Sequence, residues 1–557
     1  MVRRMNFRNE RTLYNRKCDL CKKEIISMYD KNHIAPVYCY DCWHSDKWNP
    51  MDYGNEYDLK ITFFEQIKNL VQKVPCLALE GYKNTNATYS NFTWLSKNVY
   101  LSPSTLSSEN VAYSKAIYYA RDIFESYRFN YSELAYEGIN GQKNSRVKFL
   151  QNSYECLDSY FLYDCVNCQN CFMSSNLRHQ KYVFRNKKLA KEEYEQKMRE
   201  IDFGSYEQIV DLIKEYESAK LSSVRKFIDS KNVTNVTGDS ITNSKNSIQC
   251  FNIEKCEDVK YFFQGLEIKD GMDLTGAGGP AEILYEGVNV GYQDTNILFC
   301  LNSYIGCIEL KYDNQCSNSQ YIFGCVGLRN KQYCILNKQY AKEEYETLVP
   351  KIIKHMNDMP YIDQKGRIYK YGEFFPPELS PFAYNETIAQ EYFPLTKDEA
   401  IKKGYSWKDP EPRNYTITLK TEDIPDHIKD VKDSILNDII QCAHHELGHS
   451  VSKCNEQCTE AYRIIPQELD FLRKMNLPLP RLCPNCRHYQ RIKQRNPLKL
   501  WKRKCQCAGA KSENQVYTNT IAHEHGNNRC DNNFETTYAP ERPEIVYCEK
   551  CYLKEVV

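Results

Sequence analysis

The sequence has no long apolar run. None of its 557 residues lies in a stretch approaching the roughly 20 apolar residues that a membrane-spanning helix needs, and the mean hydropathy is −0.67. The first 20 residues are basic but lack the apolar segment of a secretory signal. We therefore expect a cytoplasmic protein that neither spans a membrane nor is exported.

The chain also lacks an imbalance of charge. It has 74 Lys and Arg against 73 Asp and Glu, a formal net charge of +1. The total charge therefore favours neither nucleic acid nor a membrane surface as a partner, and only local patches can decide. The length allows three or four ordinary domains with a sizeable core.

Cysteine, in contrast, is plentiful, with 26 residues. Many fall in CxxC pairs, whose short loop places two thiolates on one metal ion. A disulfide framework is typical of small chains in an oxidising compartment, and the sequence indicates neither. We therefore expect a reduced, zinc-loaded protein.

The first zinc unit is predicted near the N-terminus. Cys18 and Cys21 form one CxxC pair, and Cys39 and Cys42 form the next. Two such pairs are typical of a structural zinc ribbon or treble clef, in which four thiolates close the tetrahedron and leave no position open for catalysis.

The C-terminus repeats this pattern. Cys21 is followed after 18 positions by Cys39, and Cys530 is followed after 18 positions by Cys548, with matching aromatic and aliphatic residues between. Agreement of spacing and apolar positions is stronger evidence than a single motif. Either Cys505 or Cys507 would be the first partner of Cys530, with the intervening residues forming an insertion.

A third unit is predicted just upstream, around Cys458 and the pair Cys483 and Cys486, with Cys454 or Cys442 as first partner. We expect three structural zinc ions, and as many as five if the His-rich insertions also bind metal. The predicted ligands are Cys18, Cys21, Cys39, Cys42, Cys454, Cys458, Cys483, Cys486, Cys505, Cys530, Cys548 and Cys551. Further candidate ligands are Cys442, His444, His445, His449, Cys507, His523 and His525.

The centre of the chain is duplicated. Residues 177–195 match residues 328–346 at 11 of 19 positions with an offset of 151, and Cys156 and Cys165 fall on Cys307 and Cys316 at the same offset. In the second copy, four cysteines recur every nine residues from Cys307. This period predicts a β-solenoid of about 18 residues per two-strand coil, with its cysteines packed inward rather than serving metal or redox chemistry.

These patterns predict a mainly β protein with helices, a duplicated β-solenoid flanked by treble-clef or zinc-ribbon units. Helices are expected at 189–198 and 340–353. The expected division is a zinc ribbon at 1–58, a helical linker at 59–96, solenoid blocks at 97–220 and 221–359, an irregular linker at 360–438 and tandem zinc units at 439–557.

One motif suggests catalysis. His445, Glu446 and His449 form a complete HExxH, in which two histidines hold zinc and the glutamate activates water in metallopeptidases. Gly448 disfavours the helix that this geometry needs, and nearby cysteines would close the coordination sphere. We therefore expect a structural role here and keep a zinc-dependent hydrolase as the alternative.

A second motif is electrostatic. Residues 473–504 contain eleven Lys and Arg and no Asp or Glu. A zinc knuckle that fixes a basic segment with aromatic residues is suited to phosphates and unpaired bases. The alternative is a basic segment that packs on an acidic face of the solenoid. The predicted nucleic-acid contacts are Arg487, Tyr489, Arg491, Lys493, Arg495, Lys499, Trp501, Lys502, Arg503 and Lys504.

Several strings together resemble a known group of proteins. VYCYDCWHSDKWNP, GCVGLRNKQYCILNKQYAKEEYE and FETTYAPERPEIVYCEKCY are similar to cysteine-rich zinc-ribbon proteins of candidate-phylum bacteria. The resemblance implies paired zinc ribbons with a repeat region, and the group has no assigned activity. The sequence thus predicts a multi-zinc binding module, with nucleic acid as the favoured partner and a protein-interaction scaffold on the solenoid as a further alternative.

Overall fold

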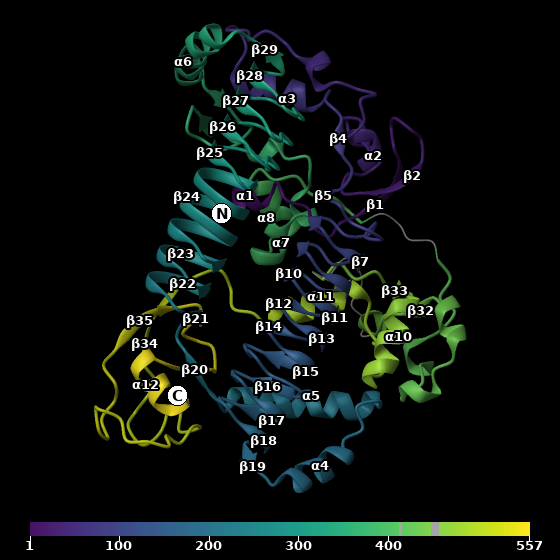
Figure 1. The fold of residues 1–557 in the computed structure, drawn as a ribbon, viewed down its shortest axis with the longest axis vertical. Coiled ribbons are helices and arrows are strands. Elements are labelled where there is room, and N and C mark those ends of the chain that lie inside the picture. The colour runs from purple at the N-terminus through teal and green to yellow at the C-terminus, as the bar shows by residue number, and fades with distance from the viewer. Residues whose placement is uncertain (411–414, 447–455) are drawn as a thin grey trace.

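The computed structural model describes residues 1–410, 415–446 and 456–557. The protein is mainly β with some helices, and its centre is a β-solenoid of about 21 turns. Figure 1 shows the solenoid as two arms, with cysteine-rich units packed along them. We call residues 81–188 arm 1 and residues 230–339 arm 2.

Arm 1 is built from short parallel strands, except for the final antiparallel pair β18–β19. Its strands are β5 (Gly81–Tyr82), β6 (Thr93–Trp94), β7 (Lys97–Tyr100), β8 (Thr105–Leu106), β9 (Glu109–Ala112), β10 (Ile117–Tyr118), β11 (Arg121–Phe124), β12 (Tyr127–Asn130), β13 (Glu133–Tyr136), β14 (Ile139–Gln142), β15 (Ser145–Gln151), β16 (Tyr160–Tyr163), β17 (Gln169–Ser175), β18 (Lys181–Phe184) and β19 (Lys187–Lys188). The arm therefore begins before residue 97, inside the stretch expected to be a helical linker.

Arm 2 is built in the same way and also ends in an antiparallel pair. Its strands are β21 (Ser230–Lys231), β22 (Thr234–Thr242), β23 (Lys245–Glu254), β24 (Glu257–Gly291), β25 (Thr295–Leu298), β26 (Ile308–Lys311), β27 (Gln320–Phe323), β28 (Gln332–Ile335) and β29 (Lys338–Gln339).

The coil has 12 residues rather than the expected 18. Arg121 pairs with Glu133, and Glu133 pairs with Ser145; some coils of arm 2 have 13, as where Thr295 pairs with Ile308. Left-handed backbone recurs every third residue, four times per coil. The nine-residue cysteine period is therefore three quarters of a coil, and cysteines 18 apart do not superpose.

The coil interior is filled by ladders of small side chains. The Ser114 hydroxyl donates to the Ala112 carbonyl at 2.9 Å and accepts from the Ser126 amide at 3.0 Å, one coil on. Cysteine takes the same places elsewhere, and the Cys165 thiol donates to the Ser174 carbonyl at 3.7 Å. These cysteines are buried, and in the described part of the chain none of them belongs to a metal-binding group.

The two copies of the repeat have equivalent structures. The amide of Cys156 donates to Asn144, and that of Cys307 donates to Asp294. The amides of Cys165 and Cys316 each donate to a serine of the preceding coil. Each copy then ends in a two-residue hairpin strand followed by a helix, α4 (Lys191–Arg199) or α6 (Lys342–Asp358), close to the ranges expected for these helices.

The remaining elements form the units around the arms. The other strands are β1 (Tyr14–Lys17), β2 (Glu24–Ser27), β3 (Val37–Tyr38), β4 (Cys76–Leu77), β20 (Val224–Lys226), β30 (Tyr361–Ile362), β31 (Ile368–Tyr369), β32 (Ile440–Gln441), β33 (Ala461–Tyr462), β34 (Trp501–Lys504), β35 (Asn533–Thr536) and β36 (Ile545–Tyr547). The other helices are α1 (Val2–Met5), α2 (Tyr40–Trp43), α3 (Phe63–Val71), α5 (Tyr206–Leu221), α7 (Ile388–Tyr392), α8 (Lys397–Lys402), α9 (Ala443–Glu446), α10 (Pro466–Met475), α11 (Pro484–Lys493) and α12 (Glu549–Val556), with short 3₁₀ turns at 50–53, 377–379, 384–386, 421–423, 428–430 and 433–437.

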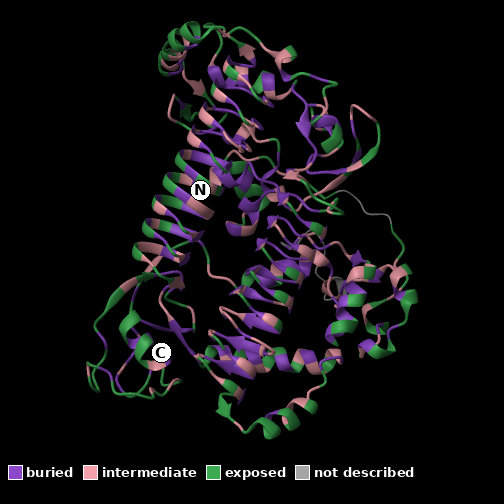
Figure 2. Cartoon of the chain, viewed as in Figure 1, coloured by how far each residue is buried: buried purple, intermediate pink, exposed green. Residues whose placement is uncertain are grey.

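The expected irregular linker at 360–438 lies partly between the arms. Its helix α7 carries Glu391, which forms an ion pair with Lys115 of arm 1. The neighbouring Tyr392 packs edge-on against Phe263 of arm 2, with ring centroids 4.6 Å apart. Figure 2 shows buried residues concentrated along both arms and exposed residues on the outer helices. Within the described residues, every helix is too short or too polar to cross a bilayer.

Candidate metal centres

The N-terminal unit (residues 1–58) brings its four predicted ligands together. Cys18, Cys21, Cys39 and Cys42 place their sulfurs within 4.8 Å of one another. The hairpin β1–β2 presents the first pair, and Cys39 caps the N-terminus of α2. This group could hold a metal ion, as the sequence predicts.

The middle unit (residues 440–493) uses Cys442 as its first cysteine. The sulfurs of Cys442, Cys458, Cys483 and Cys486 lie within 4.8 Å of one another, and all four residues are buried. Cys454, predicted as a ligand with Cys442 as the open alternative, lies outside the described residues. Fifteen residues therefore separate the first two cysteines of this unit, where the N-terminal unit has two.

In the C-terminal unit (residues 501–557), Cys505, and not Cys507, is the first cysteine of the group of four. Cys505, Cys530, Cys548 and Cys551 form the group of four, within the same 4.8 Å limit. Residues 506–529 are the insertion between its first two cysteines, and this insertion contains Cys507, His523 and His525.

The three groups share one geometry. The amide of the third cysteine donates to the sulfur of the first in every unit, at 3.3 Å from Cys39, 3.2 Å from Cys483 and 3.2 Å from Cys548. The sulfurs of the second and third cysteines are 3.9 Å apart in all three units. Tetrahedral zinc with bonds of about 2.3 Å places sulfurs about 3.8 Å apart, whereas a disulfide needs about 2.05 Å.

Local hydrogen bonds favour the thiolate at several of these positions. Burial opposes ionisation of Cys18, but backbone amides, including those of Cys21 and Cys39, lower its pKa to about 7. Hydrogen bonds from Cys442, Cys458 and Cys486 lower the pKa of Cys483 well below its usual value. The thiolate is the form that binds metal, so these hydrogen bonds favour metal binding at Cys18 and Cys483. Burial raises the pKa of Cys42 to about 12, and hydrogen bonds with the neighbouring cysteines raise that of Cys486.

A fourth group forms in the C-terminal insertion. Cys507, His523 and His525 meet Cys551 within 4.8 Å. These three residues were further candidate ligands, and the structure places them beside the C-terminal group. Cys551 belongs to both groups, which the sequence pattern alone did not indicate.

The middle insertion shows a related arrangement. Nδ1 of His444 lies 3.3 Å from the sulfur of Cys486 and 3.2 Å from a carboxylate oxygen of Glu456. The expected sequence candidates did not include Glu456, because a lone acidic residue carries no ligand signal. Of the HExxH, His445 and Glu446 lie in the short helix α9, whereas His449 lies outside the described residues, so the hydrolase geometry stays untested.

The basic segment packs onto arm 1 through Arg487 and Arg491. The guanidinium of Arg487 pairs with Glu125 of arm 1 and lies 2.8 Å from Glu468. Arg491 pairs with Glu125 as well, and its Nε is 3.3 Å from Glu137. Both arginines are buried, so the expectation that they contact phosphate is not met in this fold.

The remaining predicted contacts divide between paired and exposed side chains. Lys493 pairs with Glu456, Arg495 lies 3.7 Å above the ring of Tyr392, and Arg503 is buried against the Ala539 carbonyl. Tyr489 and Trp501 are half-buried. Lys499, Lys502 and Lys504 are exposed.

The cysteine-rich units pack on the arms. The N-terminal unit pairs β3 with β4 at the start of arm 1, and its Trp43 lies beneath Arg329 of arm 2 at 4.9 Å. The middle unit stacks Phe471 on Phe124 of arm 1, with centroids 3.9 Å apart.

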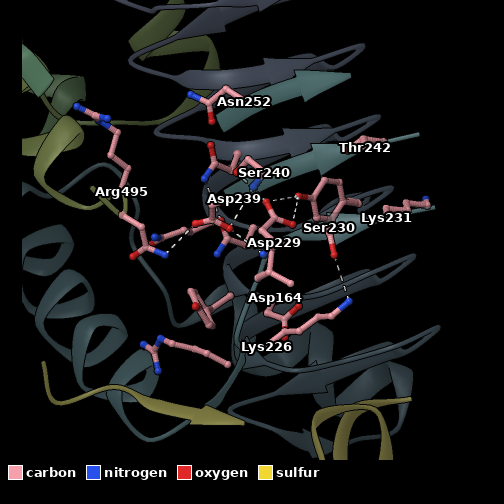
Figure 3. A pocket seen from close by; sticks show the side chains of 18 of the residues that line it. Asp164, Lys226, Asp229, Ser230, Lys231, Asp239, Ser240, Thr242, Asn252 and Arg495 are labelled. Atoms are coloured by element: carbon pink, nitrogen blue, oxygen red, sulfur yellow. Dashed lines mark hydrogen bonds between the residues drawn. The ribbon is translucent and has the colours of Figure 1, made fainter. Parts of the chain in front are cut away.

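The C-terminal unit contacts both arms around a pocket of about 390 Å³ (Figure 3). Thr537 donates to Asp239 of arm 2 at 2.6 Å, and the hydroxyl of Tyr552 donates to Asp164 of arm 1. Within the pocket, Asp229, the residue directly before arm 2, accepts from Tyr154 of arm 1 at 3.2 Å. Burial, followed by the nearby Asp229 charge, raises the pKa of Asp239. These carboxylates join the arms to each other and to the unit.

Comparison with known proteins assigns no family. No protein-family model matches the chain, and no curated protein matches it. Among solved structures, one match is the crystal structure of a "putative acetyltransferase" from Desulfovibrio desulfuricans G20, at 7% identity, covering 51% of this chain and 85% of that one, with a TM-score of 0.10. A TM-score this low supports no argument about fold or activity.

Proposed function

We propose that the protein is a zinc-stabilised scaffold, in which three structural zinc ions in treble-clef-like units fix the two solenoid arms relative to each other. The observation that carries this proposal is the recurrence of one four-sulfur geometry in three units. Four thiolates suit zinc, which favours sulfur ligands and tetrahedral coordination. A closed shell of this kind stabilises a fold and leaves no position for a substrate.

The treble-clef assignment rests on local structure. In each unit an antiparallel strand pair, β1–β2, β32–β33 or β34–β35, precedes the second cysteine pair. The first cysteine of that second pair is the N-cap of a helix, at Cys39, Cys483 and Cys548. The resemblance to zinc-ribbon proteins of candidate-phylum bacteria supports the same architecture. A reduced, cytoplasmic setting fits 25 described cysteines that form no disulfide among themselves.

Nucleic-acid binding through the basic segment has less support than the scaffold. Glu125, Glu137 and Glu468 neutralise Arg487 and Arg491 inside the protein, and three exposed lysines remain. The contacts of Arg487 and Arg491 support the alternative that this segment packs on an acidic face of the solenoid. Protein partners would then be bound on the exposed solenoid surface, where tyrosines such as Tyr119 and Tyr131 stack in the open.

Metal content with matched cysteine variants tests the proposal. We expect Cys442→Ser to lose one zinc ion per chain because it removes one of four ligands. Cys316→Ser is the control, since Cys316 is equally buried but occupies a solenoid ladder where serine occurs in neighbouring coils. Zinc is counted by inductively coupled plasma mass spectrometry on reduced protein.

Two results would refute the scaffold. One is a wild-type chain that binds fewer than three zinc ions. The other is a Cys442→Ser variant that keeps the same zinc content as Cys316→Ser.

A further inference from the structure

Cys551 lies where two ligand groups meet. Its sulfur is within 4.8 Å of the sulfurs of Cys505, Cys530 and Cys548, and also within 4.8 Å of the ligand atoms of Cys507, His523 and His525. Apart from His525, which is half-buried, all of these side chains are buried. Two complete sets of four donors therefore share one sulfur atom.

The histidines are oriented as metal ligands. Nδ1 of His525 lies 2.7 Å from the Asn528 carbonyl, which accepts its proton and leaves the Nε2 lone pair 3.5 Å from the Cys551 sulfur. With bonds of about 2.05 Å to nitrogen and 2.3 Å to sulfur, a tetrahedral zinc ion would place these two atoms about 3.6 Å apart. The measured separation matches that value.

Surrounding residues hold the other ligands in place. Nε2 of His523 lies 2.8 Å from Glu555, so its Nδ1 is the atom available to a metal. Asn519 donates to the Cys507 sulfur at 3.1 Å, and Tyr547 donates to Asn519 at 2.8 Å. A carboxylate or carbonyl behind a ligating histidine, with hydrogen bonds to the other ligands, is typical of metal sites.

Charge also favours two ions over one. A single zinc ion bound to four thiolates leaves two net negative charges, and the Cys507 thiolate beside it would add a third. A second zinc ion, bound to Cys507, neutral His523 and His525 and a shared Cys551, leaves one net negative charge for the whole cluster. In a buried site the smaller charge is less costly.

We propose that the C-terminal unit holds a dinuclear zinc cluster, in which the Cys551 thiolate bridges one ion held by Cys505, Cys530 and Cys548 and a second held by Cys507, His523 and His525. The proposal rests on the zinc loading proposed above. It adds a fourth ion and gives Cys551 a role that no other cysteine of its tetrad has.

The wild-type full chain tests the bridge directly. The protein is loaded with ¹¹³Cd, and the cadmium resonances are recorded by NMR. Two ions that share a sulfur are scalar-coupled, so we expect one coupled pair among the resonances of the C-terminal unit. Cadmium resonances with no coupling between any pair would overturn the proposal.

Variants locate the bridge by counting zinc ions lost relative to wild type. We expect Cys551→Ala to lose two ions, Cys530→Ala one and His525→Ala one. Cys530→Ala is the matched control, because a variant that simply unfolds the unit would lose both ions from this position as well. His179→Ala, an exposed histidine on arm 1, should lose none.

The two proposals fail differently. If Cys551→Ala loses one ion, as Cys530→Ala does, or His525→Ala loses none, the dinuclear cluster is refuted while three structural zinc ions stand. If the wild-type chain binds fewer than three zinc ions, the scaffold proposal itself fails.

Discussion

Removing the buried charge of Glu125 tests whether its ion pairs hold the middle unit on arm 1. The Glu125 side chain is 1% exposed and pairs with two arginines that are 6% and 2% exposed. We expect Glu125→Gln to reduce the free energy needed to open the contact between the middle unit and arm 1 by about 3 kcal/mol. Breaking a buried ion pair from one side costs about 3–5 kcal/mol, and the lower end applies because Glu468 and Glu137 still face Arg487 and Arg491.

The measurement should follow the contact rather than the whole chain, because a protein of several units need not unfold in one step. Hydrogen exchange of the α11 amides reports local opening free energies. We expect Glu125→Gln to accelerate exchange in α11 by about two orders of magnitude, the factor that corresponds to 3 kcal/mol at 25 °C.

Glu133→Gln is the control. Glu133 is the first residue of β13 on the same arm and pairs with Arg121, but both side chains are more than half exposed. An exposed pair contributes about 0–1 kcal/mol. If Glu125→Gln changes α11 exchange no more than Glu133→Gln does, the buried pairs do not hold this unit on the arm.

Three other predictions concern a buried carboxyl group, the proposed zinc ions and the exposed lysines. Burial raises the pKa of Glu80 to about 7, so the stability that the protonated carboxyl group contributes is complete below about pH 4.5 and is lost as pH rises through 7, at a cost of about 3 kcal/mol. In urea titrations from pH 5.5 to 8, the stability of Glu80→Gln should therefore rise progressively relative to that of the wild type, and a constant difference would contradict this. Zinc removal by a chelator under reducing conditions should expose the segment between the middle unit and arm 1 to protease, and an unchanged digestion pattern would show that metal does not hold the units. In filter binding to duplex DNA, a plot of log affinity against log salt concentration should have a slope no steeper than about −3, because three exposed lysines can each release about one counterion. A slope near −5 that the combined changes Lys499→Ala, Lys502→Ala and Lys504→Ala leave unchanged would indicate that the buried arginines contact DNA.

The cysteine pairs could be predicted because their ligand spacing is local. CxxC places two sulfurs together whatever surrounds it, so the N-terminal group follows from the sequence. That Cys442 belongs to the group of four in the middle unit could not be predicted, since an insertion separates the first two cysteines of this unit and spacing no longer constrains them. The amide of Cys483, which donates to Cys442, supplies that constraint only in the fold.

The solenoid could be predicted in kind but not in coil length. Nine-residue spacing fits either half of an 18-residue coil or three quarters of a 12-residue coil. A better signal was present in arm 1, where Ser90, Ser102, Ser114 and Ser126 recur every 12 residues and form the inner ladder.

Which charges of the basic segment are buried and paired depends on residues far away in the sequence. Its neutralising partners, Glu125 and Glu137, lie more than 350 positions upstream of Arg491. A local count of charge therefore overstates what the segment presents to solvent.

Zinc X-ray absorption spectroscopy of the intact, reduced protein would show whether cysteine thiolates hold the zinc ions of this scaffold, because it reports what surrounds the metal in all units at once. We expect a first shell dominated by sulfur at about 2.3 Å, with a minor nitrogen contribution from the histidines of the C-terminal unit. A shell dominated by nitrogen and oxygen, or protein that contains no zinc, would contradict it.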